Sequence, residues 1–301
     1  MSSKKKSRVV PWLLVILPVW LIASAAFALV KYFKDEKATQ AEEEKRFART
    51  VSSALIADDL RKIVTIIGER NSSKSTELRA MASMIQGSLG PSNTGYDINL
   101  VDGPADFPLI RVSIPAIDEN AAPIWIVTSY DSPRGSVGGE KNATGLTATL
   151  ATAQALASST PSQTIHFLFL PHVNDTDAPV LETAKLAANL IENGSKPHAL
   201  LCIEAMGEQE ELIVSSRDIA ALDNFQVDGL GKILGAEIVC LSDDFDLASI
   251  LFELGLPAVR ISTRPTLLPG EADDKLPFAP TVSASTGRLI ELINRFDGTS
   301  P

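Results

Sequence analysis

The side chains of this sequence that could do chemistry at neutral pH follow three apolar runs. They are Ser129 and Asp131 after residues 124–128, His172 and Asn174 after residues 164–170, and Glu204 at the end of residues 199–204. Because the carboxyl ends of parallel strands meet at one edge of a sheet, these groups are expected to share one site. Hydroxyl, carboxylate and imidazole groups act as nucleophiles, as acid–base catalysts or as metal ligands.

Several familiar kinds of site are disfavoured by the local sequence. Ser129 is not in a Gly-x-Ser-x-Gly turn and has no histidine spaced as its base, which argues against a serine hydrolase. The glycine-rich loop at residues 138–145 lacks both the Lys-Ser/Thr ending of a P-loop and a GxGxxG pattern, so no nucleotide is expected. The acidic residues 243–246 lack EF-hand spacing and are interpreted as a solvated turn.

A single metal ion is a further possibility for the same edge. Asp131, His172 and Glu204 are the candidate ligands, with Asp175 nearby in the sequence. Taken one at a time, such residues are more often helix caps or loop residues. The other two histidines, at positions 166 and 198, fall within or at the start of predicted strands and are expected to be structural or surface residues.

The elements that would position these residues alternate between strands and helices. Strands are predicted at residues 96–101, 109–114, 123–128, 164–170, 199–204, 237–241 and 258–262. Helices are predicted at residues 55–67, 75–89, 146–157, 179–191, 217–234, 247–254 and 282–296. This alternation predicts an α/β fold with a mostly parallel mixed sheet between two layers of helices.

The order of these elements resembles the family of di-zinc aminopeptidases that also holds glutaminyl cyclase, the transferrin receptor and nicastrin. Four stretches carry the resemblance. Residues 60–89 look like the family's entry region, 126–131 like its strand ending in His-Tyr-Asp, 138–145 like its Gly-Ala-x-Asp-Asn-x-Ser-Gly loop, and 252–258 like its Phe-x-x-x-Gly-Ile-Pro-Ala segment. The resemblance covers residues 55–297 and implies a three-layer, zinc-aminopeptidase-like domain.

The resemblance also implies roles for single positions, and most of the metal ligands are missing. Ser129 stands where the first histidine ligand belongs, and Asp131 matches the aspartate that orients that histidine. Asn174 falls near the Glu-Glu pair that supplies the general base and a ligand. Glu204 matches a ligand aspartate, whereas no histidine follows His198, so the last histidine ligand is absent.

Lys141 is the largest departure from the family pattern, because it stands where the carboxylate that bridges two zinc ions belongs. A cation ~4 Å from another cation is repelled by about 4 kcal/mol at an effective dielectric constant of ~20. We therefore expect the Lys141 ammonium group to take the place of the metal and to pair with Asp131 and Glu204.

The resemblance with its lost ligands favours a non-enzymatic function. The chain is expected to be a pseudo-peptidase that binds a peptide or protein partner and carries no cofactor. The alternative is an active metal-dependent aminopeptidase or cyclase with a non-standard, single zinc ion. A third class of function is a purely structural spacer. The same fold serves both enzymes and receptors, so the fold alone does not choose among these functions.

The first residues predict the location of the protein. Residues 1–8 are a basic tail, residues 9–31 an apolar stretch long enough to cross a bilayer, and residues 32–54 a charged helical stalk. The basic excess before the span predicts a single-pass signal anchor with a cytoplasmic N-terminus and an extracytoplasmic domain. A cleaved signal peptide, with small residues at 26 and 28, is the rival reading.

The overall charge and cysteine content limit which classes of partner and which covalent links are expected. A formal net charge of −10 and a pI of about 4.9 argue against nucleic acid, because an acidic surface repels phosphate. The only two cysteines, Cys202 and Cys240, both lie in apolar runs. They are interpreted as buried thiols, and a disulfide between them stays open if the compartment is oxidising.

Overall fold

The computed structural model describes Lys31 and residues 51–118, 120–175, 178–193, 196–227, 235–240, 246–265 and 273–298. The predicted basic tail, the predicted span except Lys31, and residues 32–50 of the predicted stalk lie outside the described residues, as do residues 243–245 of the acidic turn. Among the described residues no helix is long and apolar enough to cross a membrane. The chain divides into two compact units, Met1–Ala48 and Arg49–Pro301, and the predicted α/β domain lies within the second.

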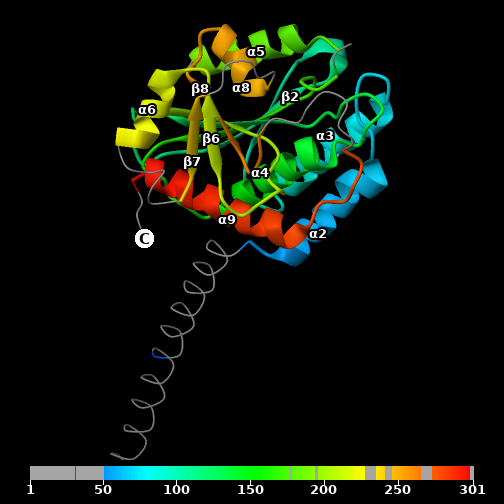
Figure 1. Ribbon diagram of the computed structural model, residues 1–301, viewed down its shortest axis with the longest axis horizontal. Helices are drawn as coiled ribbons and strands as arrows, with labels where there is room; N and C mark the ends of the chain where they lie inside the picture. Colours follow the sequence, from blue (N-terminus) through cyan, green and yellow to red (C-terminus); the bar gives the residue numbers. More distant parts are fainter. Residues whose placement is uncertain are drawn as a thin grey trace, which may run out of the picture. The chain divides into compact units, whose positions relative to one another are not determined.

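The second unit is built on one sheet of eight strands in the order β1-β2-β4-β3-β5-β8-β6-β7 (Figure 1). The strands are β1 (Ile98–Val101), β2 (Leu109–Ile114), β3 (Ile124–Ser129), β4 (Ile165–Leu170), β5 (Ala199–Ile203), β6 (Ile213–Ser216), β7 (Glu237–Cys240) and β8 (Ala258–Ser262). The pairs β3–β4, β3–β5, β5–β8 and β6–β7 are parallel, and the other three pairs are antiparallel. The mixed, mostly parallel sheet predicted from the sequence is confirmed.

Two layers of helices cover the sheet. The helical elements are α2 (Ser53–Leu60), η1 (Arg61–Ile67), α3 (Ser75–Leu89), η2 (Pro104–Asp106), η3 (Gly139–Ala143), α4 (Thr144–Ala155), α5 (Val180–Glu192), α6 (Ile219–Val227), α8 (Leu247–Glu253) and α9 (Ala279–Phe296). One apolar core contains side chains of α2, α3, α4, α6 and α9, and a separate one contains those of α5 and α8. Figure 1 shows α5 and α8 on one side of the sheet and α4 and α9 on the other.

The central strand β3 shows why this sequence makes such a sheet. All six of its residues are buried, as expected for a strand covered by helices on both faces. Its register pairs Ser129 with Leu170 of β4, and Val127 with Cys202 of β5. The carboxyl ends of β3, β4 and β5 therefore lie together at one edge of the sheet.

Some elements differ from the sequence-based prediction. Strand β6 was not expected, because it has only four residues, two of them serines, and follows an acidic run. It pairs antiparallel with β8 and parallel with β7, so it lies between two strands that were predicted. Helix α2 begins at Ser53, inside the segment assigned to the stalk. Helix α9 begins at Ala279, three residues before its predicted start.

The interpretation of both cysteines as buried is wrong for one of them. Cys202 lies in the central strand β5 and is buried, whereas Cys240 ends the edge strand β7 and is exposed. Both are free thiols, so the structure contains no bond between them. Burial raises the pKa of the Cys202 thiol well above its ordinary value, which makes that thiol unreactive.

Candidate functional site

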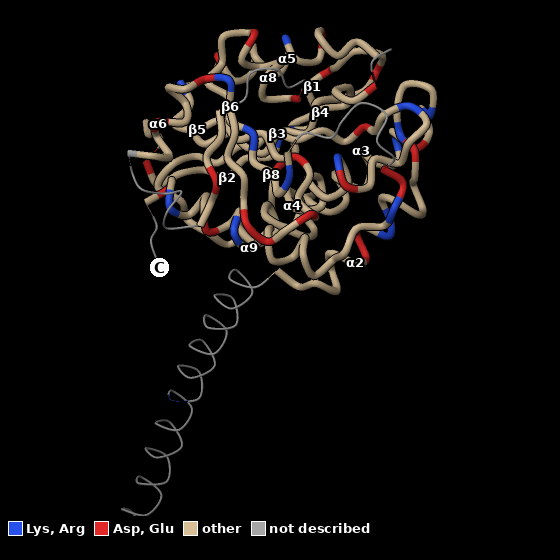
Figure 2. The backbone as a smooth tube through the Cα atoms, viewed as in Figure 1, with Lys and Arg blue, Asp and Glu red and all other residues tan. Residues whose placement is uncertain are grey.

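The candidate site lies at the carboxyl ends of β3, β4 and β5, where the sequence placed it. Ser129 is the last residue of β3, Asn174 lies in the loop after β4, and Glu204 directly follows β5. Figure 2 shows acidic and basic positions next to one another beside β3 and β8. The side chains there form two separate groups, one made mostly of amides and hydroxyls and one made of charges.

The first group, which we call the amide cluster, consists of Ser129, Asp131, Asn142 and Asn174. The Ser129 hydroxyl oxygen accepts hydrogen bonds from the side-chain amides of Asn174 at 2.8 Å and of Asn142 at 3.2 Å. The Asn174 amide also donates to Asp131 Oδ1 at 3.0 Å. Ser129, which stands where the family pattern has a histidine ligand, is thus hydrogen-bonded to two neutral amides.

Asp131 connects the amide cluster to the backbone of the loop after β4. It is fully buried, and its Oδ2 accepts the backbone N–H groups of Val173, Asn174 and Asp175 at 2.9, 2.8 and 3.2 Å. Burial raises the pKa of Asp131 to about 6, and these donors oppose that rise. Asp131 therefore fixes the loop that follows β4.

The second group, which we call the charge triad, consists of Glu204, Asp246 and Arg260. Arg260 Nε lies 3.1 Å from Glu204 Oε2 and 3.7 Å from Asp246 Oδ2. The other carboxylate oxygens accept backbone N–H groups, Glu204 Oε1 from Leu247 at 3.1 Å and Asp246 Oδ1 from Ser249 at 2.7 Å. All three side chains are at most 11% exposed, so the guanidinium group is the counter-ion of a buried pair of acids.

Lys141 does not take the position expected for it. The Lys141 side chain makes no ion pair with any residue of the described ranges, and Glu204 pairs with Arg260 instead. The backbone of Lys141 makes the structural contacts. The Lys141 N–H donates to Asp273 Oδ2 at 2.9 Å, and the Lys141 carbonyl accepts the Ala205 N–H. The expectation that Lys141 pairs with Asp131 and Glu204 is wrong, because Glu204 pairs with Arg260 of β8 and Asp131 accepts N–H groups of the loop after β4.

The loop of Lys141 is held by two close approaches that need glycine. A Cβ atom on Gly139 would lie 2.4 Å from the Lys275 carbonyl oxygen, and one on Gly145 would lie 2.9 Å from Glu204 Cα. The Asp273 carboxylate also accepts the Glu140 N–H at 2.6 Å. The segment that begins at Asp273 therefore packs directly on the loop at the carboxyl edge of the sheet.

His172 lies apart from both groups. Its ring is buried and stands edge-on to Phe107 at 5.4 Å between centroids. Neither ring nitrogen makes a hydrogen bond of standard geometry in the described structure. Burial lowers the pKa of His172, and the Pro104 carbonyl and the Asp175 charge oppose that change. The His172 imidazole therefore makes no hydrogen bond to a carboxylate or amide of either group.

The described residues do not fit the metal ions that the resemblance implies. Within the described ranges, no group of three or more His, Cys, Asp or Glu side chains is arranged to hold a metal ion. Of the three candidate ligands, Asp131 is bonded to backbone N–H groups, Glu204 to Arg260, and His172 faces Phe107. Asp175 accepts hydrogen bonds from the N–H and hydroxyl of Ser72.

Sequence reasoning missed three residues that shape the site. Asp246 was interpreted as part of a solvated acidic turn, and this is wrong for that residue, because Asp246 is buried and caps the start of α8. Asn142 and Arg260 were not among the predicted site residues, although Arg260 carried a usable signal as the only charge in the apolar run of residues 258–262. Arginine is almost never fully buried without a partner, so such a position predicts an acidic side chain nearby. The partner itself, at residue 204 beside the neighbouring strand, follows only once β5 and β8 are known to pair.

The buried carboxylates predict how stability depends on pH. Burial raises the pKa values of Asp131 and Asp246 to about 6 and that of Glu140 to about 7. Because these folded-state values exceed the unfolded ones, the folded protein binds more protons, and stability falls as pH rises from about 4 to 7. We expect the free energy of unfolding in urea to be larger at pH 5 than at pH 8 by about 2 kcal/mol or more. Glu140→Gln should shrink that difference, and equal stability at both pH values would contradict this account.

The comparisons with known proteins bear on the fold. No protein-family model matches the chain, and no curated protein matches it. Solved structures do match. The LapA aminopeptidase of Legionella pneumophila has a TM-score of 0.66 at 14% identity, over 87% of this chain and 75% of that one. The glutaminyl cyclase of Tannerella forsythia has a TM-score of 0.62 at 12% identity, over 81% and 98%. The zinc aminopeptidase BSAP of Bacillus subtilis has a TM-score of 0.62 at 9% identity, over 82% and 95%.

Proposed function

We propose that this chain, which has the fold of the di-zinc aminopeptidases and glutaminyl cyclases, is a membrane-anchored binding protein without peptidase chemistry. Its partner is a peptide or another protein. The single observation that carries the proposal is the charge triad, in which Arg260 neutralises the acid at the one retained ligand position, Glu204. A guanidinium group cannot be deprotonated in a protein, so it competes permanently with any metal ion for that carboxylate.

The amide cluster supports the same proposal from a second direction. Hydrolysis at a zinc centre needs a bound water that loses a proton near neutral pH and a nearby general base. Asn174, which stands near the base position, carries an amide that accepts no proton, and this amide donates to both Ser129 and Asp131. The amides of Asn142 and Asn174 are bonded to Ser129 and Asp131, and a substrate would have to displace these bonds.

The anchor belongs to the proposal because the amino-terminal sequence favours it. A basic tail at residues 1–8 followed by the apolar residues 9–31 orients the domain away from the cytoplasm. The exposed thiol of Cys240 offers a test of that orientation. A membrane-impermeant maleimide should label Cys240 in cells with an intact cytoplasmic membrane, and labelling only after lysis would contradict an extracytoplasmic domain.

The alternative function, a hydrolase or cyclase with one zinc ion, needs Asp131, His172 and Glu204 to converge on one point within about 2.0–2.2 Å. Their present partners differ and none is shared. Binding a metal ion there would require Arg260 to leave Glu204 and Asp131 to release three N–H groups. No contact of the described residues favours this alternative over the binding function.

Activity assays distinguish the two functions. The full chain, purified in detergent and supplied with excess zinc, is assayed with aminoacyl nitroanilides and with an amino-terminal glutaminyl peptide. BSAP, treated in the same way, serves as the positive control. We expect no turnover above that of the Glu204→Gln variant. Turnover that chelator abolishes and zinc restores in the wild-type chain, but not in the variant, would establish the alternative.

A further inference from the structure

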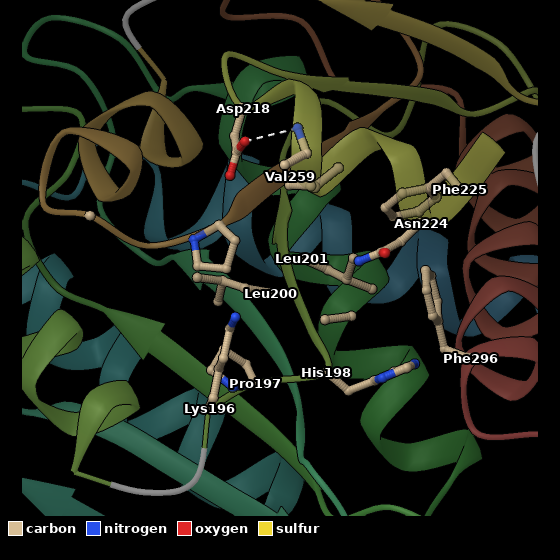
Figure 3. A pocket seen from close by; sticks show the side chains of 15 residues that line it. Lys196, Pro197, His198, Leu200, Leu201, Asp218, Asn224, Phe225, Val259 and Phe296 are labelled. Carbon is tan, nitrogen blue, oxygen red and sulfur yellow. Dashed lines mark hydrogen bonds between the residues drawn. The ribbon is translucent and has the colours of Figure 1, made fainter. Parts of the chain in front are cut away.

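A cavity lies at the opposite edge of the sheet from the candidate site. Its volume is about 410 Å³, and it is lined by residues at the amino ends of β5 and β8, by α6 and by the end of α9 (Figure 3). The lining reaches along β5 as far as Leu201, which is three residues, or roughly 10 Å at ~3.3 Å per residue, from Glu204. Nothing in the amide cluster or the charge triad takes part in it.

The inner wall of the cavity is apolar and aromatic. The rings of Phe225 and Phe296 pack edge to face with centroids 4.9 Å apart, and His198 stands edge-on to Phe296 at 5.8 Å. Leu201 and Val259 of the sheet complete the wall, and both are buried. Small-molecule sites of 300–1,000 Å³ are typically lined in this way, with a few polar groups that fix orientation. A large aliphatic or aromatic group suits this wall.

Two opposite charges lie on the other side of the same cavity. Figure 3 shows the charged ends of Lys196 and Asp218 directed towards one another across it. Neither side chain forms an ion pair with another described residue. One oxygen of Asp218 accepts the Ala220 N–H at 3.0 Å in the first turn of α6, which holds the carboxylate in place and leaves its second oxygen for another donor. The cavity therefore offers one cation and one anion besides its apolar wall.

We propose that this cavity binds a free amino acid with a large apolar side chain. The side chain packs on Phe225 and Phe296, the α-carboxylate pairs with Lys196, and the α-ammonium group pairs with Asp218. A zwitterion matches the two rim charges without leaving a net charge in the cavity, whereas a purely apolar or singly charged ligand satisfies only part of the lining. This site is separate from the partner binding proposed above and does not depend on it.

Calorimetric titration of the full chain in detergent with L-phenylalanine tests the proposal. We expect saturable binding, with each of three probes binding at least about fivefold more weakly: N-acetyl-L-phenylalanine, L-phenylalanine amide and L-alanine. These lack the ammonium group, the carboxylate and the ring, respectively. Absence of saturable L-phenylalanine binding up to about 10 mM would overturn the proposal, as would equal binding of the four probes.

Variants locate the binding. Lys196→Gln should weaken L-phenylalanine about fivefold and leave L-phenylalanine amide unaffected, because the amide has no carboxylate for Lys196 to pair with. Asp218→Asn should weaken L-phenylalanine about fivefold and leave N-acetyl-L-phenylalanine unaffected, because the acetylated compound has no ammonium group for Asp218 to pair with. The asparagine side chain can still accept the Ala220 N–H at the start of α6. Lys185→Gln, at an exposed position of α5, is the matched control. Equal losses in Lys196→Gln and Lys185→Gln, or no loss in either rim variant, would contradict this location.

Discussion

Replacing Arg260 with methionine is expected to lower the free energy of unfolding by about 3–5 kcal/mol. The change removes the guanidinium group but keeps a long apolar side chain, so Glu204 and Asp246 are left buried together without a counter-ion. Breaking a buried ion pair by removing one partner is much more destabilising than losing a surface pair, because the remaining charge has no water to solvate it. Urea denaturation of the full chain measures the loss as a shift of the midpoint.

Two further variants decide whether the charge triad is the cause. Arg288→Met removes an exposed arginine that lies 3.5 Å from Glu291 on α9, and it should change stability by less than about 1 kcal/mol. Adding Glu204→Gln and Asp246→Asn to Arg260→Met should restore most of the lost stability, because neutral amides carry no uncompensated charge. An Arg260→Met protein as stable as the Arg288→Met control would show that the triad is not a buried electrostatic unit.

Replacing Asp131 with alanine is expected to cost about 3–6 kcal/mol, because three backbone N–H groups at the carboxyl end of β4 lose their common acceptor. Each unsatisfied buried donor costs about 1–3 kcal/mol. The same urea titration measures the loss. Asp131→Asn is the matched variant. Its amide oxygen can still accept the three N–H groups, whereas its NH2 group cannot accept the hydrogen bond from Asn174, so its loss should be about 1–2 kcal/mol. If both variants lose the same amount, the acceptor role of Asp131 is not what holds this loop.

The fold was largely predictable because its strongest signals are local. Continuous apolar runs predicted the central strands, and residues with helical spacing predicted α3 and α5 to within about two residues. Strand β6 was missed because its alternation of apolar and serine residues is too short to stand out from a loop. Its antiparallel pairing with β8 depends on a chain reversal after Glu204, and no local pattern encodes that reversal.

The sequence predicted where the site lies, but not which residue pairs with Glu204. The strand-end rule placed Ser129, Asp131, Asn174 and Glu204 at one edge of the sheet, and that no ordinary zinc site forms from them stays a prediction. The partner of Glu204 was assigned to Lys141 because the family pattern aligns Lys141 with the bridging ligand. Arg260 supplies that charge instead, since its register next to Cys202 on β5 brings the guanidinium group to the end of the strand.

The backbone explains why Lys141 does not reach the acids. The Lys141 N–H and the Glu140 N–H are both bound by Asp273, and Gly139 packs on the backbone of Lys275. These contacts connect segments more than a hundred residues apart in the sequence, so alignment with a motif could not reveal them. They fix the loop as a helix start capped by a carboxylate, and this capping is a structural role that needs no metal ion.

The number of zinc ions that the chain retains tests the central claim most directly. The full chain in detergent is stripped with chelator, reloaded with excess zinc, desalted and analysed by elemental mass spectrometry, with BSAP carried through the same steps as the positive control. We predict close to zero zinc per chain, both for the wild type and for Glu204→Gln, because Arg260 already neutralises the acid that a metal ion would need. One or more tightly held zinc ions per wild-type chain, lost in Glu204→Gln, would contradict the account and establish a metal site at this edge of the sheet.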